Sequence, residues 1–408
     1  MVFQGRSMKK EWIVRRAFSG IIMAMVQPLS LYIHIPFCRT RCFYCDFNTF
    51  AGKERLIPDY TAAICSEIRR QKNYADAPVC SVYFGGGTPS RLDLSDVDTI
   101  IDAVRKTFDI LPDAEVTFEC NPCDVTADYA EGLSKAGVNR ISLGMQSAVP
   151  EELKHMGRRH TPEQTALAVE KLRNAGQRNI SLDLIYGYPG QTPESWAYSV
   201  QAVIALDVQH ISLYALSVEE GSALRRLLAS GKLELPDEDA VVAMYEHAAE
   251  TLAGHGFRHY EISNWAIDAA HESRHNKQYW YVRPYYGFGA GAHGWIERQR
   301  IRNEGSIEGY IKKMNASADR FPAAAEIIPQ DRRTEMQDVM MLGLRMLQEG
   351  ITEEGFCERF GEDMRTVFRR ELWHLERKDL VRWAPDGRLL LAPDKVMVAN
   401  QAFIEFVD

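Results

Sequence analysis

Residues 31–47 read LYIHIPFCRTRCFYCDF, so a short run of β-branched and aromatic residues leads directly into three closely spaced cysteines. The first five residues of this stretch have the composition of a buried strand. Cys38, Cys42 and Cys45 then offer three thiolates on one short loop. Zinc sites normally use four ligands, often as two separated pairs, whereas iron–sulfur clusters take cysteines at irregular short spacings. From spacing alone, a cluster with one iron free of protein ligands and a zinc site completed by His34 or a distant residue both remain open.

Strand-like runs alternate with helical stretches from this point to about Gly254. Such regular alternation predicts a parallel α/β domain. About six strand–helix units are present, so a partial, sixfold β/α barrel and a doubly wound sheet both fit the periodicity. The predicted strands are Leu31–Ile35, Ser81–Phe84, Glu115–Glu119, Arg140–Leu143, Ile180–Ile185 and His210–Leu213. The predicted helices include Asp59–Lys72, Leu94–Phe108, Pro162–Ala175 and Glu194–Ala205.

Several predicted strands end in glycine, charged or amide residues, which packing of a hydrophobic core does not require. The second strand runs into a Gly-Gly-Gly-Thr-Pro loop, residues 85–89, and the third ends at Glu119. Gln146 follows the fourth strand, and Asp183 sits in the otherwise apolar fifth, where an unpaired charge would be costly. Functional residues of α/β barrels gather at the C-terminal ends of the strands. We therefore expect these residues to share one site with the cysteines, which favours the barrel.

Four segments are expected along the chain. Residues 1–27 form an N-terminal extension whose start resembles an expression tag, and residues 28–257 form the partial barrel. Residues 258–330 are an aromatic and glycine-rich connector. Residues 331–408 are expected to form a mainly helical, winged-helix-like domain, because helical patterns around 334–348 and 364–378 precede a Pro-Asp-Gly hairpin.

The composition excludes several classes of protein. Hydrophobic residues make up 46% and charged residues 25% of the 408 positions, which is typical of a globular chain. The net charge of −8 argues against a nucleic-acid partner. No segment reaches the ~18 consecutive apolar residues of a membrane span. Eight cysteines in a chain this long indicate a reducing cytoplasm rather than a disulfide scaffold.

The cysteine loop and the glycine loop together resemble the radical S-adenosylmethionine (SAM) superfamily. The residues Tyr32–Cys38 are similar to the branch that holds the oxygen-independent coproporphyrinogen III oxidases, called HemN-like, and the heme chaperones, called HemW. The resemblance extends from about Leu31 into the C-terminal segment and implies a partial barrel of radical SAM type. It also implies a [4Fe-4S] cluster on Cys38, Cys42 and Cys45, with SAM chelated by the open iron. One-electron reduction of SAM would yield a 5′-deoxyadenosyl radical.

The resemblance further implies a set of SAM-binding residues. Arg158 suits a carboxylate, while Glu119 or Asp183 suits an ammonium group or ribose hydroxyls. The nearby Cys120 and Cys123 have the spacing of a redox or metal pair, and their role is left open. The implied SAM contacts are Tyr32, Phe47, Gly86, Gly87, Thr88, Glu119, Gln146, Arg158 and Asp183.

Two features separate the branches of this family. Phe47 stands where the oxidases carry a fourth cysteine, which resembles HemW and argues against porphyrinogen decarboxylation. Residues 275–280 match the His-Asn-x-x-Tyr-Trp motif of HemW, which implies heme binding through His275, Asn276, Tyr279 and Trp280. Read without the resemblance, this motif predicts an aromatic loop packed over the barrel mouth. The glycine-rich stretch 286–295 that follows could approach a flat ligand or SAM, or serve as a packed connector.

The expected function is therefore a HemW-type heme chaperone that delivers heme to acceptor hemoproteins of the respiratory chain. Its cofactors would be the [4Fe-4S] cluster and SAM, and an electron donor such as a flavodoxin or ferredoxin would reduce the cluster. No further catalytic residue is expected. The protein would be cytoplasmic, with peripheral contact at the inner face of the membrane. The alternatives are an oxygen-independent coproporphyrinogen III oxidase and another HemN-like radical enzyme, such as a methyltransferase.

Overall fold

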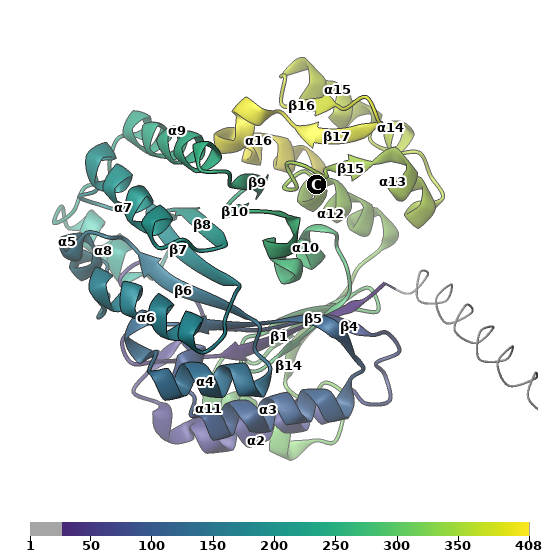
Figure 1. The fold of residues 1–408 in the computed structure, drawn as a ribbon. Coiled ribbons are helices and arrows are strands. Elements are labelled where there is room, and N and C mark those ends of the chain that lie inside the picture. Colours follow the sequence, from purple (N-terminus) through teal and green to yellow (C-terminus); the bar gives the residue numbers. More distant parts are fainter. Residues whose placement is uncertain (1–26, 408) are drawn as a thin grey trace, which may run out of the picture.

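The computed structural model describes residues 27–407 of the chain. The extension expected over residues 1–27, with its tag-like start, therefore lies outside the described residues except for its last position. Within the described part, helices pack against one broad sheet, and a second group of helices formed by the C-terminal residues lies beside it (Figure 1). None of the helices described has the length and apolar composition of a membrane span.

The centre of the sheet is a series of neighbouring parallel strands that includes all the strands predicted from the sequence. Their C-terminal ends meet at one edge of the sheet, where barrel folds of this type place their functional residues. This arrangement confirms the α/β class and the partial barrel. In sheet order the strands are β1 (Leu29–Ile35), β4 (Val79–Gly86), β5 (Ile110–Cys120), β6 (Arg140–Gln146), β7 (Ile180–Tyr186) and β8 (His210–Ala215).

Helices between the parallel strands cover the outer face of the sheet (Figure 1). Thr161 and Thr192 begin two of them with capping boxes, in which the threonine hydroxyl accepts from the third helical N–H and that residue's side chain accepts from the threonine N–H. These local contacts fix where the two helices begin. The covering helices are α2 (Ile57–Arg70), α3 (Leu94–Thr107), α4 (Ala127–Ala136), α5 (Pro150–His155), α6 (Pro162–Asn174), α7 (Pro193–Ala205), α8 (Ala223–Ala229) and α9 (Glu238–Gly254).

Residues 258–330 extend the sheet at both of its ends. At one end β10 (Asn264–Ala266) and β9 (Arg258–Glu261) continue antiparallel from β8. At the other end β11 (Tyr285–Phe288) pairs in parallel with β1, and three antiparallel strands follow. No strand was predicted here because the strands are short, and because glycines interrupt the alternation of β11 and of β12 (His293–Ile296). The remaining elements are β12 (His293–Ile296), β13 (Gln299–Asn303), β14 (Ala324–Pro329), α10 (Arg274–Trp280) and α11 (Ile307–Ala316).

Helix α10 packs against strands β4 and β5 on the inner face of the sheet. Glu115 of β5 accepts hydrogen bonds from the backbone N–H groups of Arg274 and His275, at 2.9 and 3.1 Å. Ser81 of β4 contacts the His275 ring. The helix therefore begins on carboxylate and hydroxyl groups of the strands, and its first N–H groups are satisfied there.

The C-terminal residues build a hydrophobic cluster of their own. The Pro385–Gly387 turn joins β16 to β17 as predicted, and β15 completes a small antiparallel sheet. The first predicted helix ends at Gly343 rather than near Gln348, and the second is interrupted at Phe368. The elements are α12 (Arg332–Gly343), β15 (Ile351–Thr352), α13 (Glu353–Phe360), α14 (Met364–Val367), α15 (Arg369–Arg377), β16 (Val381–Trp383), β17 (Arg388–Leu391) and α16 (Asn400–Phe403).

Shorter elements complete the described chain. The strands β2 (Phe37–Cys38) and β3 (Phe50–Ala51) pair with each other on either side of the cysteine loop. Single 3-10 turns lie at Glu54–Leu56, Pro89–Arg91, Pro122–Asp124, Ala269–His271, Pro393–Val398 and Ile404–Phe406.

Candidate functional site

The C-terminal ends of the parallel strands open into a cavity of about 360 Å³, called here the cysteine cavity. Cys38, Cys42 and Cys45 all line it. The Cys38 Sγ lies 3.4 Å from the Thr88 hydroxyl, and the Cys42 Sγ lies 3.5 Å from a guanidinium nitrogen of Arg158. The three predicted ligands and two of the predicted SAM contacts are thus brought to one place.

His34 is not arranged to complete a zinc site with these thiols. Its Nδ1 lies 3.0 Å from the Tyr32 hydroxyl, and its Nε2 lies 2.9 Å from the backbone oxygen of Asn48. Both ring nitrogens are therefore occupied. Among the residues described, no three His, Cys, Asp or Glu side chains converge as a single metal ion would require. The thiols suit a multi-iron cluster better than one zinc ion.

The glycine loop after β4 packs against the start of the cysteine loop. The Gly87 N–H donates to the Ile35 oxygen and the Thr88 N–H to the Phe37 oxygen, both at 2.9 Å. A Cβ on Gly87 would lie 2.8 Å from the Ile35 oxygen, and one on Gly86, at φ +110°, would lie 2.4 Å from the His34 ring. Only glycine fits at these two positions. Their packing places the Thr88 hydroxyl beside Cys38.

Two half-buried carboxylates, those of Glu119 and Asp183, face the same cavity. Glu119 accepts hydrogen bonds from the Tyr83 hydroxyl at 2.7 Å and from the Gly86 N–H at 3.2 Å. Burial, together with the neighbouring Asp183, raises the pKa of Glu119 to about 7. Asp183 accepts from the Ser142 hydroxyl at 3.0 Å, and burial raises its pKa as well. Paired carboxylates in an enclosed space favour a cationic ligand.

Arg158 and Gln146 carry buried polar atoms that have no partner within the described chain. The Arg158 guanidinium donates to the Gly144 oxygen at 2.7 Å, but its Nε is left unpaired. The Gln146 Oε1 is also unpaired, and its backbone has φ +67°, an uncommon conformation for a residue other than glycine. Unpaired polar groups, thiols and carboxylates thus surround one cavity. Such a cavity fits a ligand that carries both positive and negative groups, as SAM bound to a cluster does.

Tyr32 and Phe47 lie differently from the other predicted SAM contacts. The structure does not bring Tyr32 into the cysteine cavity, because its side chain lines a neighbouring cavity and stacks on Tyr83, with ring centroids 6.2 Å apart. Phe47 is 65% exposed and lines both cavities. Its side chain therefore stands between the two.

The second cavity, called here the aromatic cavity, has a volume of about 480 Å³. It lies between β1, the β11–β12 hairpin, the end of α10 and helix α12 of the C-terminal domain. The sequence signalled part of its lining through Tyr279 and Trp280 of the heme motif, through Tyr32 and Phe47, and through the glycine-rich stretch 286–295. The residues missed include Arg283, Tyr285, Arg300, Asp338 and Leu342, while His293 and Trp295 lay in the stretch without an assigned role.

The predicted heme motif is divided between the core and the aromatic cavity. His275 is 1% exposed, with Nδ1 2.9 Å from the Ser81 hydroxyl and Nε2 2.8 Å from the Tyr279 hydroxyl. Burial lowers the pKa of His275 to about 3. Tyr279 and Trp280 line the aromatic cavity, while His275 and Asn276 line neither cavity.

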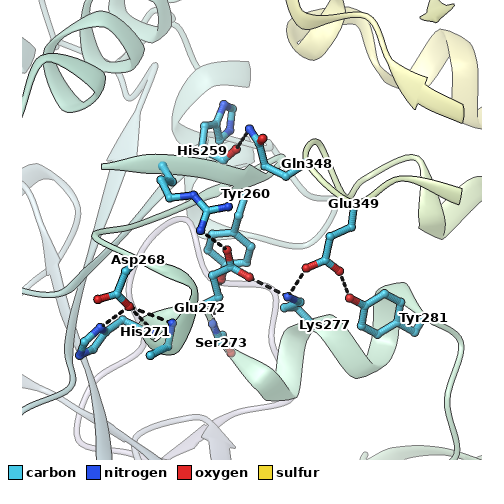
Figure 2. A network of polar contacts seen from close by, with 12 residues as sticks. His259, Tyr260, Asp268, His271, Glu272, Ser273, Lys277, Tyr281, Gln348 and Glu349 are labelled. Carbon is cyan, nitrogen blue, oxygen red and sulfur yellow. Dashed lines mark hydrogen bonds and ion pairs between the residues drawn. The ribbon is translucent and has the colours of Figure 1, made fainter. Parts of the chain in front are cut away.

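A polar network anchors the motif helix to the chain around Glu349 (Figure 2). The Lys277 ammonium donates to Glu272 at 2.7 Å and to Glu349 at 2.6 Å. The Tyr281 hydroxyl donates to the other oxygen of Glu349. Glu349 lies between α12 and β15, so the network joins α10 to the C-terminal domain.

Comparisons with known proteins agree with this geometry. The family model described as the radical SAM superfamily matches residues 32–203. The heme chaperone HemW of Bacillus subtilis is 33% identical over 380 residues, which cover 93% of this chain and 99% of that protein. HemW of Escherichia coli is 38% identical over 274 residues, covering 67% of this chain and 71% of that protein. The solved structure of Escherichia coli coproporphyrinogen III oxidase (HemN), a radical SAM enzyme, has a TM-score of 0.80 over 93% of this chain and 90% of its own, at 22% identity, and so shares the fold.

Proposed function

The chain belongs to the HemW family of radical SAM proteins, and from this premise we propose that it binds heme and transfers it to acceptor hemoproteins. The observation that carries the proposal is the aromatic cavity, which lies beside the cysteine cavity and shares Phe47 with it. Aromatic walls offer a flat, apolar surface to a porphyrin. A cavity of about 480 Å³ is within the usual range for bound cofactors and small molecules.

Membership of the radical SAM family implies a [4Fe-4S] cluster and SAM. In the proposal Cys38, Cys42 and Cys45 hold the cluster, which supplies one electron to the sulfonium of SAM when both are bound. Arg158 pairs with the SAM carboxylate through a charge-assisted hydrogen bond. Glu119 and Asp183 accept hydrogen bonds from its ammonium group and ribose hydroxyls. Support comes from the unpaired polar atoms of Arg158 and Gln146 at this cavity.

Phe47 weighs against coproporphyrinogen oxidation. It occupies the position at which the oxidases carry a fourth cysteine, and its ring is 65% exposed at the boundary of the two cavities. A phenyl ring supplies neither a thiolate nor a proton there. Heme handling by this protein therefore does not include decarboxylation of a porphyrinogen.

The partners follow from the same proposal. The heme acceptors are respiratory hemoproteins, and a flavodoxin or ferredoxin reduces the cluster. The protein works in the cytoplasm and contacts the inner face of the membrane peripherally when it delivers heme to membrane-bound acceptors. The net charge of −8 supports the absence of a nucleic-acid partner.

One anaerobic experiment tests the proposed function. The cluster is reconstituted in the full-length protein, and ferric heme binding, heme transfer to the apo-form of a respiratory cytochrome, and coproporphyrinogen III turnover are measured on the same preparation. We expect stoichiometric heme binding, transfer faster than from free heme, and no turnover. An oxygen-independent oxidase assayed in parallel is the positive control. Conversion of coproporphyrinogen at a rate similar to that control would overturn the chaperone function.

A further inference from the structure

The residue that ligates heme iron is not settled by the predicted motif, because His275 is held away from both cavities. Its two ring nitrogens contact the Ser81 and Tyr279 hydroxyls at 2.9 and 2.8 Å, and its side chain is buried beneath α10. Binding iron would require breaking both contacts and would leave buried hydroxyl groups unsatisfied. An iron ligand for the proposed cargo must be found elsewhere.

The walls of the aromatic cavity contain polar groups that lack a partner within the described residues. The indole N–H groups of Trp280 and Trp295 are buried and make no hydrogen bond. The side chain of Trp295 is 7% exposed, so its N–H has little access to water. A buried indole normally finds a hydrogen-bond acceptor. These two groups therefore point to a ligand that brings acceptors into the cavity.

Two histidines line the aromatic cavity, and their surroundings differ. His34 has both ring nitrogens engaged, by Tyr32 and by the backbone oxygen of Asn48. His293 has no hydrogen bond on its ring within the described chain, and its side chain is exposed. It begins β12, and Trp295 lies on the same side of that strand, because alternate residues of a strand share a face. Of the two, only the imidazole of His293 can ligate iron without breaking an existing hydrogen bond.

The cations at this cavity also differ from each other. Arg300 donates to Asp338 at 2.6 Å and is neutralised by it. Arg283 forms no ion pair with any described residue, and its guanidinium lies 4.8 Å from the Tyr281 ring centroid. A half-buried arginine without a carboxylate is suited to bind one that arrives with a ligand. Heme carries two propionate carboxylates on one edge of its ring.

We propose that heme is bound in the aromatic cavity, with His293 as an axial ligand of its iron and Arg283 as the partner of a propionate. The porphyrin then lies against the aromatic walls that Tyr279 and Trp280 help to form, so the C-terminal half of α10 contacts the cargo while His275 positions the helix. This assignment deepens the proposed heme-chaperone function and depends on it.

The test uses full-length protein with its cluster reconstituted anaerobically and left oxidised. Ferric heme is titrated into wild type, His293→Ala, Arg283→Met and His247→Ala, the last being an exposed histidine on α9 that lines neither cavity. The spin state of the heme is read by electron paramagnetic resonance, in which the oxidised [4Fe-4S] cluster is silent. We expect His293→Ala to weaken heme binding about tenfold or more and to lose the histidine-ligated spectrum, which added imidazole restores. His247→Ala should match wild type.

A second ligand separates the role of Arg283 from a general effect on folding. Arg283→Met should weaken binding of ferric heme about tenfold but leave binding of its dimethyl ester unchanged, since the ester carries no propionate charge. If wild type binds no heme, the proposed function is wrong and the assignment fails with it. If wild type binds heme and His293→Ala binds it with unchanged affinity and spectrum, the assignment alone is overturned.

Discussion

The Ser81 hydroxyl lies 2.9 Å from Nδ1 of His275, although the two residues are 194 positions apart in the chain. Ser81 belongs to a central strand of the sheet, and His275 belongs to the short helix α10 that rests on the inner face of that sheet. The contact fixes a helix whose far end lines the aromatic cavity. A histidine that reads as a metal ligand in the sequence is therefore part of the packing that shapes the site.

This contact can be measured by a double-mutant cycle of Ser81→Ala and His275→Phe. Each single change leaves a buried polar group unpaired, and we expect each to lower the free energy of unfolding by about 1–3 kcal/mol. The double variant should lose less than the sum, with a coupling of about 1 kcal/mol. The measurement is urea unfolding of the reconstituted protein followed by circular dichroism. Ser81 also donates to Ser30, and the cycle subtracts that contact. Strictly additive losses would mean that the pair does not interact.

Lys277→Met tests whether the network in Figure 2 holds α10 to the C-terminal domain. The change removes the cation between Glu349 and Glu272, of which Glu272 is 4% exposed. We expect a loss of about 1.5–3 kcal/mol, because a nearly buried carboxylate loses its closest charged partner. Thermal unfolding and hydrogen exchange of residues 332–407 report the effect. Lys106→Met, which removes an exposed pair with Asp102, is the control and should change stability by less than about 0.5 kcal/mol. Equal effects of the two changes would contradict the anchoring role.

In the proposed site, Glu119 is expected to make SAM binding depend on pH. Burial raises the pKa of its carboxyl to about 7, so the group is largely protonated below that pH and ionised above it. A cationic ligand binds the ionised form better, so SAM affinity should rise as the pH increases through about 7 and then level off. Equilibrium dialysis with labelled SAM across this range measures the dependence.

The matched variants isolate the carboxylate. Glu119→Gln should weaken SAM binding about tenfold or more and flatten its pH profile, because the amide has no charge to gain. Glu170→Gln, an exposed position on α6, should keep both the affinity and the profile of wild type. A pH profile that persists in Glu119→Gln would assign the titration to another group.

Cys42→Ala should remove the iron–sulfur cluster. Cys38 and Cys45 alone hold too few irons of a cubane, and burial raises the pKa of the Cys120 thiol at the same cavity, which makes it a poor substitute ligand. Iron and acid-labile sulfide are measured after anaerobic reconstitution, with roughly four irons per chain expected for wild type. Cys357→Ala, an exposed cysteine in the C-terminal domain, should retain the full complement. Four irons bound to the Cys42→Ala protein would show that the ligands were wrongly assigned.

The sequence by itself determined the parallel core of the fold and the cysteine cavity. The six central strands contain short runs rich in β-branched and other apolar residues, and Thr161 and Thr192 begin two of the helices with local capping contacts. The cysteine loop, the glycine loop, Glu119 and Asp183 each follow or end a strand. Parallel strands bring such positions to one edge whatever the details of packing. The local sequence pattern was enough to predict these positions, because the parallel topology then brings them together in space.

The aromatic cavity was decided only by the tertiary structure. Its walls come from β1 and, more than 200 residues later, from α10, the β11–β12 hairpin and helix α12, and glycines obscure the short strands of that hairpin in the sequence. Tyr32 points away from the cysteine cavity, His275 is buried against Ser81, and the ring of His293 makes no hydrogen bond within the described chain. Each of these depends on which side chains the fold packs beside the residue. A motif records which residues are present, whereas burial and hydrogen-bond partners, which decide what a histidine can do, exist only after the chain has folded.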